Sequence, residues 1–257
     1  MRAIAATTLL LFAAPAGAHE FWIQPTDYMP APGETIAADT RVGEAFVGSS
    51  YAYVPTRTER FDLIGPDGAA PVEGRPGDRP ALAEAVLPDG LHVIVHETAD
   101  SVLTYREDGK IQRFAAHKGF ADLVADEPVP VTEKYRRFAK SLVGVGSAEG
   151  SDAPVGMRVE LVAQANPYTD DLSGGLPVPL LEDGAPVPGY QVELFARPLG
   201  GEEVTVTKHM TDADGVAVLP VEPGTEYMAD SVLMRPWEGD DAKWYSLWAN
   251  LTFAVPG

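Results

Sequence analysis

Residues 81–97, with the sequence ALAEAVLPDGLHVIVHE, decide the fold class. Residues 81–87 and 90–97 are short apolar runs, and the second is rich in β-branched residues that favour strands. Between them stand Pro88, Asp89 and Gly90, which are typical of tight turns. We therefore predict two strands joined as a hairpin around this turn.

Prolines and glycines separate short apolar runs along the rest of the chain as well. Most of the 23 prolines and 25 glycines fall between short apolar runs, a distribution typical of all-β sandwiches. Turn sequences at 31–34 and 65–68 bound further predicted strands at 35–42 and 59–64. The sequence therefore predicts a first β-sandwich domain over residues 19–146.

Two segments of this first half show helical spacing instead. The apolar positions of the first segment are followed by Lys118, and the second segment begins after Thr132, a suitable N-cap. We predict two short helices here, with these inward-facing positions: Ile111, Phe114 and Ala115, then Tyr135, Phe138, Ala139 and Leu142.

Residues 147–154, SAEGSDAP, are small and polar and are predicted to be a linker. Beyond it, strands are predicted at 157–163, 190–196, 203–210, 215–221 and 244–255. Residues 155–257 should therefore form a second sandwich of the immunoglobulin type. The turn at 212–215 contains Asp212, Asp214 and Gly215, but turn chemistry explains these residues better than a calcium loop, because the distal glutamate is missing.

Residues 1–18 have the features of a secretory signal peptide. Arg2 precedes an apolar run over residues 4–15, and Ala16-Gly17-Ala18 places small residues where a signal peptidase cleaves. We expect export to the bacterial periplasm and a mature chain that begins at His19. No later stretch approaches the ~20 apolar residues that a membrane helix needs, so no membrane span is expected.

Composition excludes several classes of function. The absence of cysteine rules out disulfides, thiolate metal sites and cysteine nucleophiles. A net charge of −19 argues against nucleic acid or an anionic membrane as partner. There is no nucleophile elbow, phosphate loop or zinc-protease motif, so we expect a binding protein and not an enzyme.

The chain has five histidines, and His19 is the most informative of them. As the first mature residue it would offer both its α-amine and its ring Nδ1 to one metal ion. An amine with a pKa near 8 gives up its proton to a divalent metal, and one more imidazole completes a set that suits Cu(II) or Ni(II).

The remaining histidines differ in how well each could serve as a second metal ligand. His92 and His96 share a face of one predicted strand but lie ~13 Å apart, so at most one can join His19. His117 lies at the edge of a predicted helix face. For His92 and for His209, a hydrogen-bonded structural role is the better interpretation.

Taken in order, ten short segments resemble a bacterial periplasmic family known both as a domain of unknown function and as the periplasmic component of cobalt/nickel transport systems. The similarity spans essentially the whole mature chain. The segments are His19-Glu-Phe-Trp-Ile-Gln-Pro25, Pro32-Gly-Glu34, Arg41-Val-Gly43, Gly90-Leu-His-Val-Ile-Val95, Phe114-Ala-Ala-His-Lys-Gly-Phe120, Arg137-Phe-Ala-Lys-Ser-Leu142, Val159-Glu-Leu-Val162, Asn166-Pro-Tyr168, Thr211-Asp-Ala-Asp-Gly215 and Trp248-Ala-Asn-Leu-Thr-Phe253.

The resemblance implies immunoglobulin-like or transthyretin-like β-sandwich domains and a role in handling nickel, cobalt or copper, with delivery to an inner-membrane transporter. His19 matches the initial histidine of the family. The family pattern has further histidines after the Arg-Val-Gly segment and before the methionine matching Met234, where this chain has residues 44–46 and Leu233. These departures shift the expected ligand set to His19 with His96 or His117.

Two other functions fit the same residues. A copper monooxygenase also uses an N-terminal histidine with a second histidine, but it needs a flat substrate face that the sequence does not indicate. A structural module that binds a protein partner would leave His19 incidental. We expect no primary metal site in residues 155–257, which contain only His209.

Overall fold

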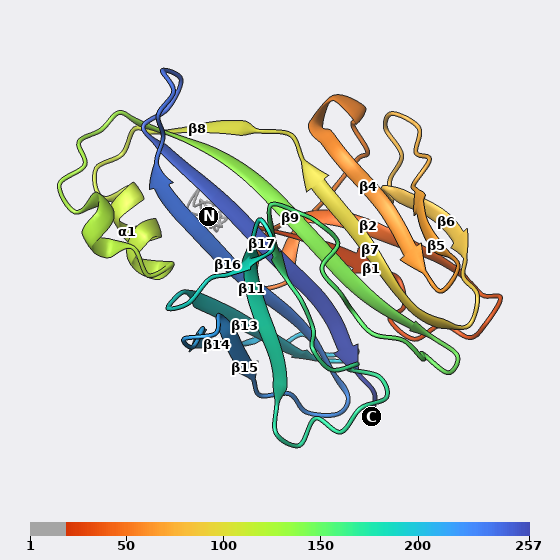
Figure 1. The fold of residues 1–257 in the computed structure, drawn as a ribbon. Coiled ribbons are helices and arrows are strands. Elements are labelled where there is room, and N and C mark those ends of the chain that lie inside the picture. The colour runs from red at the N-terminus through yellow and green to blue at the C-terminus, as the bar shows by residue number, and fades with distance from the viewer. Residues whose placement is uncertain (1–18) are drawn as a thin grey trace, which may run out of the picture.

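The computed structural model describes residues 19–257, which form three β-sheets and one α-helix (Figure 1). The strands of the first sheet are β1 (Glu20–Pro25), β2 (Thr35–Glu44), β3 (Val47–Tyr51) and β6 (Leu82–Val86). The strands of the large sheet, in spatial order, are β14 (Thr205–Met210), β13 (Gln191–Pro198), β16 (Thr225–Pro236), β17 (Trp244–Val255), β9 (Val131–Val145), β7 (Gly90–Thr98), β4 (Thr58–Gly65) and β5 (Gly68–Pro71), with β8 (Ser101–Tyr105) also pairing with β9. The strands of the third sheet are β10 (Val159–Leu161), β11 (Leu176–Glu182), β12 (Ala185–Pro186) and β15 (Val216–Leu219).

The two smaller sheets cover opposite faces of the large sheet. On β7, Val93 and Val95 belong to the core shared with the third sheet, whereas Ile94 belongs to the core shared with the first sheet. Because successive side chains of a strand point to opposite faces, β7 is buried on both sides. The mainly β, sandwich-like fold that was predicted from turn residues between short apolar runs is confirmed.

The two halves of the chain are joined within the large sheet. Strands β9 and β17 run parallel and pair from Glu133 opposite Trp244 to Ser141 opposite Thr252. Residues 147–154 have no regular secondary structure, yet Asp152 is buried and pairs with Lys140 of β9. The division into domains 19–146 and 155–257 stays a prediction.

The predicted hairpin at 81–97 is wrong, although both strands exist. Strand β6 pairs with β2 of the first sheet, whereas β7 pairs with β4 and β9 of the large sheet. The turn carries the chain from one layer of the sandwich to the other. A turn sequence cannot distinguish these two outcomes, because both place a tight reversal between two apolar strands. The turn at 212–215 also joins strands of different sheets, since β14 pairs with β13 and β15 with β11.

The first predicted helix is confirmed as α1 (Lys110–His117), which buries Ile111, Phe114 and Ala115; short 3-10 turns occur at Pro55–Arg57 and Ala121–Val124. The second predicted helix is wrong, because its residues form β9. Phe138 faces one core and Ala139 the other, so apolar residues on both faces of a central strand produced an accidental helical spacing. The neighbouring strands β7 and β17 satisfy its backbone groups.

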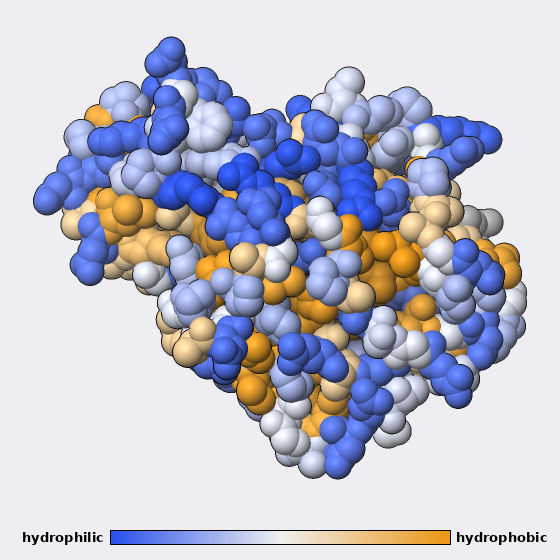
Figure 2. Space-filling model, in the orientation of Figure 1, coloured by the Kyte–Doolittle hydropathy of each residue, from blue (hydrophilic) through white to orange (hydrophobic). Residues whose placement is uncertain are grey.

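Residues 19–257 include no helix that is long and apolar enough to cross a membrane. The predicted signal peptide lies outside the described residues. Figure 2 shows hydrophobic residues reaching the surface in separate patches, with hydrophilic residues between them.

Candidate functional site

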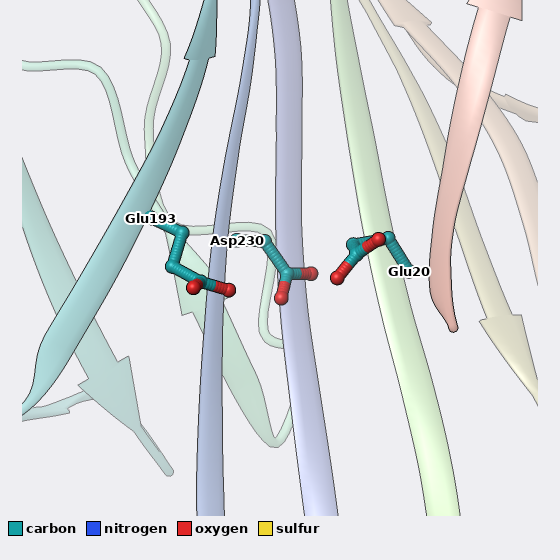
Figure 3. A group of neighbouring side chains, drawn as sticks. All are labelled: Glu20, Glu193 and Asp230. Carbon is teal, nitrogen blue, oxygen red and sulfur yellow. The ribbon is translucent and has the colours of Figure 1, made fainter. Parts of the chain in front are cut away.

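Three acidic side chains converge beneath the start of β1. Glu20 of β1, Glu193 of β13 and Asp230 of β16 each contribute one oxygen, and these oxygens lie within 4.8 Å of one another. Figure 3 shows the three carboxylates lying in a row, each directed toward the next. All three residues are at most 4% exposed. Buried carboxylates require a partner that compensates the lost hydration.

Lys118, directly after α1, supplies that partner. Its Nζ lies 3.0 Å from Glu20 Oε1 and 3.0 Å from Asp230 Oδ2, and it also donates to Glu193 Oε2. Lys118 Nζ also lies over the Trp248 ring, 5.2 Å from the ring centroid. We call Glu20, Lys118, Glu193 and Asp230 the Lys118 cluster. Because an ammonium already lies among the three carboxylates, they do not form a free metal site.

The Lys118 cluster combines three acids with one cation. Burial works to lower the pKa of Lys118, but Asp230, Glu20 and Glu193 outweigh it and hold that pKa above its ordinary value. Burial raises the pKa of Glu20 to about 7 against the opposing charge of Lys118, and burial also raises the pKa of Asp230. Glu20 is therefore a carboxyl group of the cluster whose protonation changes near neutral pH.

His117 lies beside this cluster. Its Nε2 is 2.8 Å from Glu193 Oε1, while 57% of its side chain is exposed. The main-chain oxygen of His117 accepts hydrogen bonds from Gln191 and Lys208, so strands β13 and β14 fix the end of the helix. Burial lowers the pKa of His117, and the Glu193 charge opposes that shift.

His19 directly precedes Glu20 of the Lys118 cluster in the chain. Its Nδ1 is buried and makes no hydrogen bond, and it lies 3.4 Å from Glu44 Oε1 at the end of β2. The charge of Glu44 also acts on His117, whose pKa it raises. The ion pair between Glu20 and Lys118 joins the residues that follow the two histidines in the chain. The structure thus places His19 and His117 each directly before a residue of this ion pair, and their role as ligands of one ion stays a prediction.

His96 has different surroundings. It is 5% exposed, and its ring lies 5.1 Å from the ring of Phe21 and 5.1 Å from that of Phe61. Burial lowers the pKa of His96 to about 3, so the ring stays neutral. Its Nδ1 has no hydrogen-bond partner, and Thr58 Oγ1 lies 3.5 Å from its Nε2. Its role as a ligand stays a prediction.

The other two histidines have local partners. His92 Nε2 lies 2.8 Å from the main-chain oxygen of Pro88, and the residue is buried. His209 Nε2 lies 2.8 Å from Thr207 Oγ1 on the same strand.

Sequence reasoning missed the Lys118 cluster. Glu193 and Asp230 are single charged residues inside otherwise apolar runs, Val192-Glu-Leu-Phe195 and Met228-Ala-Asp230. An isolated charge in a buried strand indicates a paired group, and this signal was available. What the sequence did not indicate is which lysine compensates the acids, because Lys118 is far from each of them along the chain.

A family model described as "Domain of unknown function (DUF4198)" matches residues 16–235. This range contains the whole Lys118 cluster together with His19 and His117. The chain belongs to the DUF4198 family. The predicted resemblance to a family of unknown function is thereby confirmed. No curated protein matches this DUF4198 chain.

Comparison with solved structures adds no argument about fold or function, because the TM-scores are 0.21. A tetra-tandem repeat from the extending region of a large adhesion protein is 11% identical, with 93% of this chain and 50% of that one covered. A mutant of Salmonella alpha-2-macroglobulin is 14% identical, with 100% and 16% covered, and a bacterial ice-binding adhesin is 13% identical, with 93% and 65% covered. The DUF4198 chain thus spans about half the length of the first of these.

Proposed function

We propose that the protein binds a divalent transition-metal ion in the periplasm, with His19 as the chelating residue and His117 as the second imidazole. The observation that carries the proposal is the buried Nδ1 of His19, which has no hydrogen-bond partner and lies beside Glu44. A buried polar atom without a partner is costly, and a metal ion would supply that partner.

The donor set suits such an ion. An N-terminal His19 offers its α-amine and Nδ1, His117 offers a second ring nitrogen, and Glu44 offers an oxygen. Imidazole and amine nitrogens with one carboxylate bind Cu(II), Ni(II), Co(II) and Zn(II), with affinities that generally rise toward copper. Glu44 belongs to residues 44–46, where the family resemblance places a histidine, so in this chain an oxygen takes the place of a nitrogen.

Contacts of the Lys118 cluster and of Arg137 hold the main chain around His19 in position. Glu20 follows His19 directly and is held by Lys118, and Arg137 Nη2 donates a hydrogen bond to the main-chain oxygen of His19 at 3.2 Å. These contacts hold the residue in place before a metal arrives. A site held in this way loses less conformational freedom on binding.

We further propose that the bound ion is passed to an inner-membrane importer and that the protein is not an enzyme. Support for the transport step comes from the family resemblance alone. Nickel, cobalt and copper are the expected ions.

Isothermal titration calorimetry tests the binding proposal. Protein that begins at His19 is compared with protein that carries one extra N-terminal Met, which converts the α-amine to an amide. We expect the extra residue and the His117→Ala change each to lower the affinity for Cu(II) and Ni(II) at least tenfold. His209→Ala, in which the changed residue lies on edge strand β14, is the matched control and should bind like the unmodified protein. Equal affinity with and without the extra residue would contradict the role of His19.

A further inference from the structure

A buried lysine lies with two acids between the large sheet and the third sheet. The Nζ of Lys140 on β9 is 2.6 Å from Oδ1 of Asp152 and 3.8 Å from Oε2 of Glu160 on β10. The three side chains are 0%, 1% and 1% exposed. Phe138 and Leu142 share this face of β9 with the lysine and belong to the apolar core. The amine and the carboxyl groups are therefore in contact inside the protein, away from bulk water.

Main-chain groups hold both acids in fixed positions. Oδ1 of Asp152 accepts a hydrogen bond from Ala153 N at 2.9 Å, and Oδ2 accepts one from Ala163 N at 2.8 Å. The main-chain N–H groups of residues 155–156 donate to the two oxygens of Glu160 at 2.9 and 3.1 Å. The lysine nitrogen also donates to the main-chain oxygen of Ala153 at 3.2 Å. Fixed donors on both oxygens of a carboxyl group stabilise the negative charge that develops when a nucleophile attacks its carbon.

This arrangement favours the joining of the two side chains. Holding an amine against a carboxyl group makes their reaction intramolecular, with an effective concentration that can reach about 10⁵–10⁸ M. Two charges are costly to keep in an apolar interior, and an amide has none. Exclusion of water also protects the product from hydrolysis.

We propose that Lys140 and Asp152 join in an intramolecular amide bond, with Glu160 as the proton relay. The lysine nitrogen forms a bond to the carboxyl carbon, and the bond from that carbon to one carboxyl oxygen breaks. The ammonium gives up two protons in all, and the departing oxygen leaves with both as one water molecule. Glu160 accepts a proton from the nitrogen and returns it to the departing oxygen, so it ends the reaction unchanged. The step needs no oxidant and no other co-reactant.

The bond would tie residues 147–154, which have no regular secondary structure, covalently to β9. A chain without cysteine cannot form a disulfide, and this amide would constrain the unfolded chain in the same way. The inference is independent of the proposed metal binding.

Mass spectrometry of the purified protein tests the proposal. We expect an intact mass below that of the sequence by the mass of one water molecule. Trypsin does not cleave after a lysine whose nitrogen is an amide, so residues 138–158 should appear as one peptide that also lacks one water. Cleavage after Lys134, whose Nζ lies 3.2 Å from Asp100 Oδ2 at a more exposed ion pair, is the internal control.

Two results would overturn the proposal. One is a full intact mass with normal cleavage after Lys140. The other is a missing water together with cleavage after Lys140, because dehydration of Asp152 to a succinimide loses the same water but leaves the lysine free.

Three variants test the role of each group. Lys140→Arg keeps a cation beside Asp152 but lacks the nucleophilic amine, so it should have the full mass. Asp152→Asn should still form the amide, with loss of ammonia in place of water. In Glu160→Gln, we expect the uncleaved peptide to accumulate after synthesis roughly 100-fold more slowly, as when a general acid–base group is removed. An unchanged rate would overturn the relay role of Glu160, and the measurements on the unmutated chain decide the amide bond even if a variant fails to fold.

Discussion

His96 should make the protein lose stability in acid by an amount that can be calculated. The ring lies between Phe21 and Phe61, and burial lowers its pKa from 6.5 to about 3. The perturbation is a fall in pH from 8 to 5, applied to the metal-free protein and to His96→Leu. Leucine has a similar volume and suits the apolar surroundings, but it does not titrate.

The sign follows from proton binding. Below pH 6.5 the unfolded chain binds a proton at His96 that the folded chain excludes, so stability falls as the pH falls from 6.5 toward 3. At pH 5, protonation of His96 in the unfolded chain raises the equilibrium constant for unfolding by a factor of about 30. The free energy of unfolding falls by about 2 kcal/mol as a result. Glu20 works in the opposite direction, because its raised pKa of about 7 makes the fold lose stability as the pH rises from 4.5 to 7.

The difference between the two proteins isolates His96, since Glu20 titrates in both. Urea unfolding at pH 8, 6.5 and 5 gives the free energy of unfolding of each. We expect the difference between them to shift by about 2 kcal/mol in favour of His96→Leu on going from pH 8 to pH 5. His209→Leu is the control, since His209 is half-buried at a sheet edge, and it should show a much smaller shift. Parallel curves for the unmutated protein and His96→Leu would refute the reasoning.

Two further changes separate stability from metal binding. Lys118→Met removes the ammonium from the Lys118 cluster and leaves Glu20 and Asp230 without their cation; we expect a loss of about 3–5 kcal/mol in urea unfolding together with weaker Cu(II) binding. Lys243→Met, at an exposed lysine whose partner Glu127 keeps a hydrogen bond from Trp244, should change stability by less than about 1 kcal/mol. Lys140→Met removes the partner of buried Asp152 on the opposite face of the large sheet and should cost about 3–5 kcal/mol with unchanged Cu(II) affinity. Equal Cu(II) affinity in the two buried-lysine variants would contradict the placement of the site at Lys118.

The fold class was predictable because turn residues and short apolar runs are local signals. Strand β7 was predicted almost to the residue, since its apolar positions follow directly after Gly90. The pairing of strands was not predictable in the same way. Whether β6 pairs with β7 depends on which sheet each strand completes, and that is decided by long-range packing.

The site was predictable only in part, for a similar reason. His19 and His117 could be selected as rare, chemically distinctive residues. Their connection through Glu20 and Lys118 depends on Lys118, directly after α1, reaching Glu20 of β1, which no local pattern specifies. The helical spacing around Phe138 was misleading because β9 is buried on both faces over this stretch. Such a strand lacks the alternation of apolar and polar residues that would have identified it as a strand.

The start of β1 at Glu20 has a consequence for when a metal could bind. Lys118 fixes Glu20, and His19 is therefore the last residue before a fixed strand. In a precursor that retains residues 1–18, the main-chain nitrogen of His19 is an amide, whose lone pair is delocalised and does not bind a metal near neutral pH as an amine does. Under the proposed function, cleavage after Ala18 creates the chelating amine at a position that the fold already holds beside Glu44. Metal binding would then be confined to the processed protein in the compartment where the importer collects its ion, and an unexported precursor would not compete for metal.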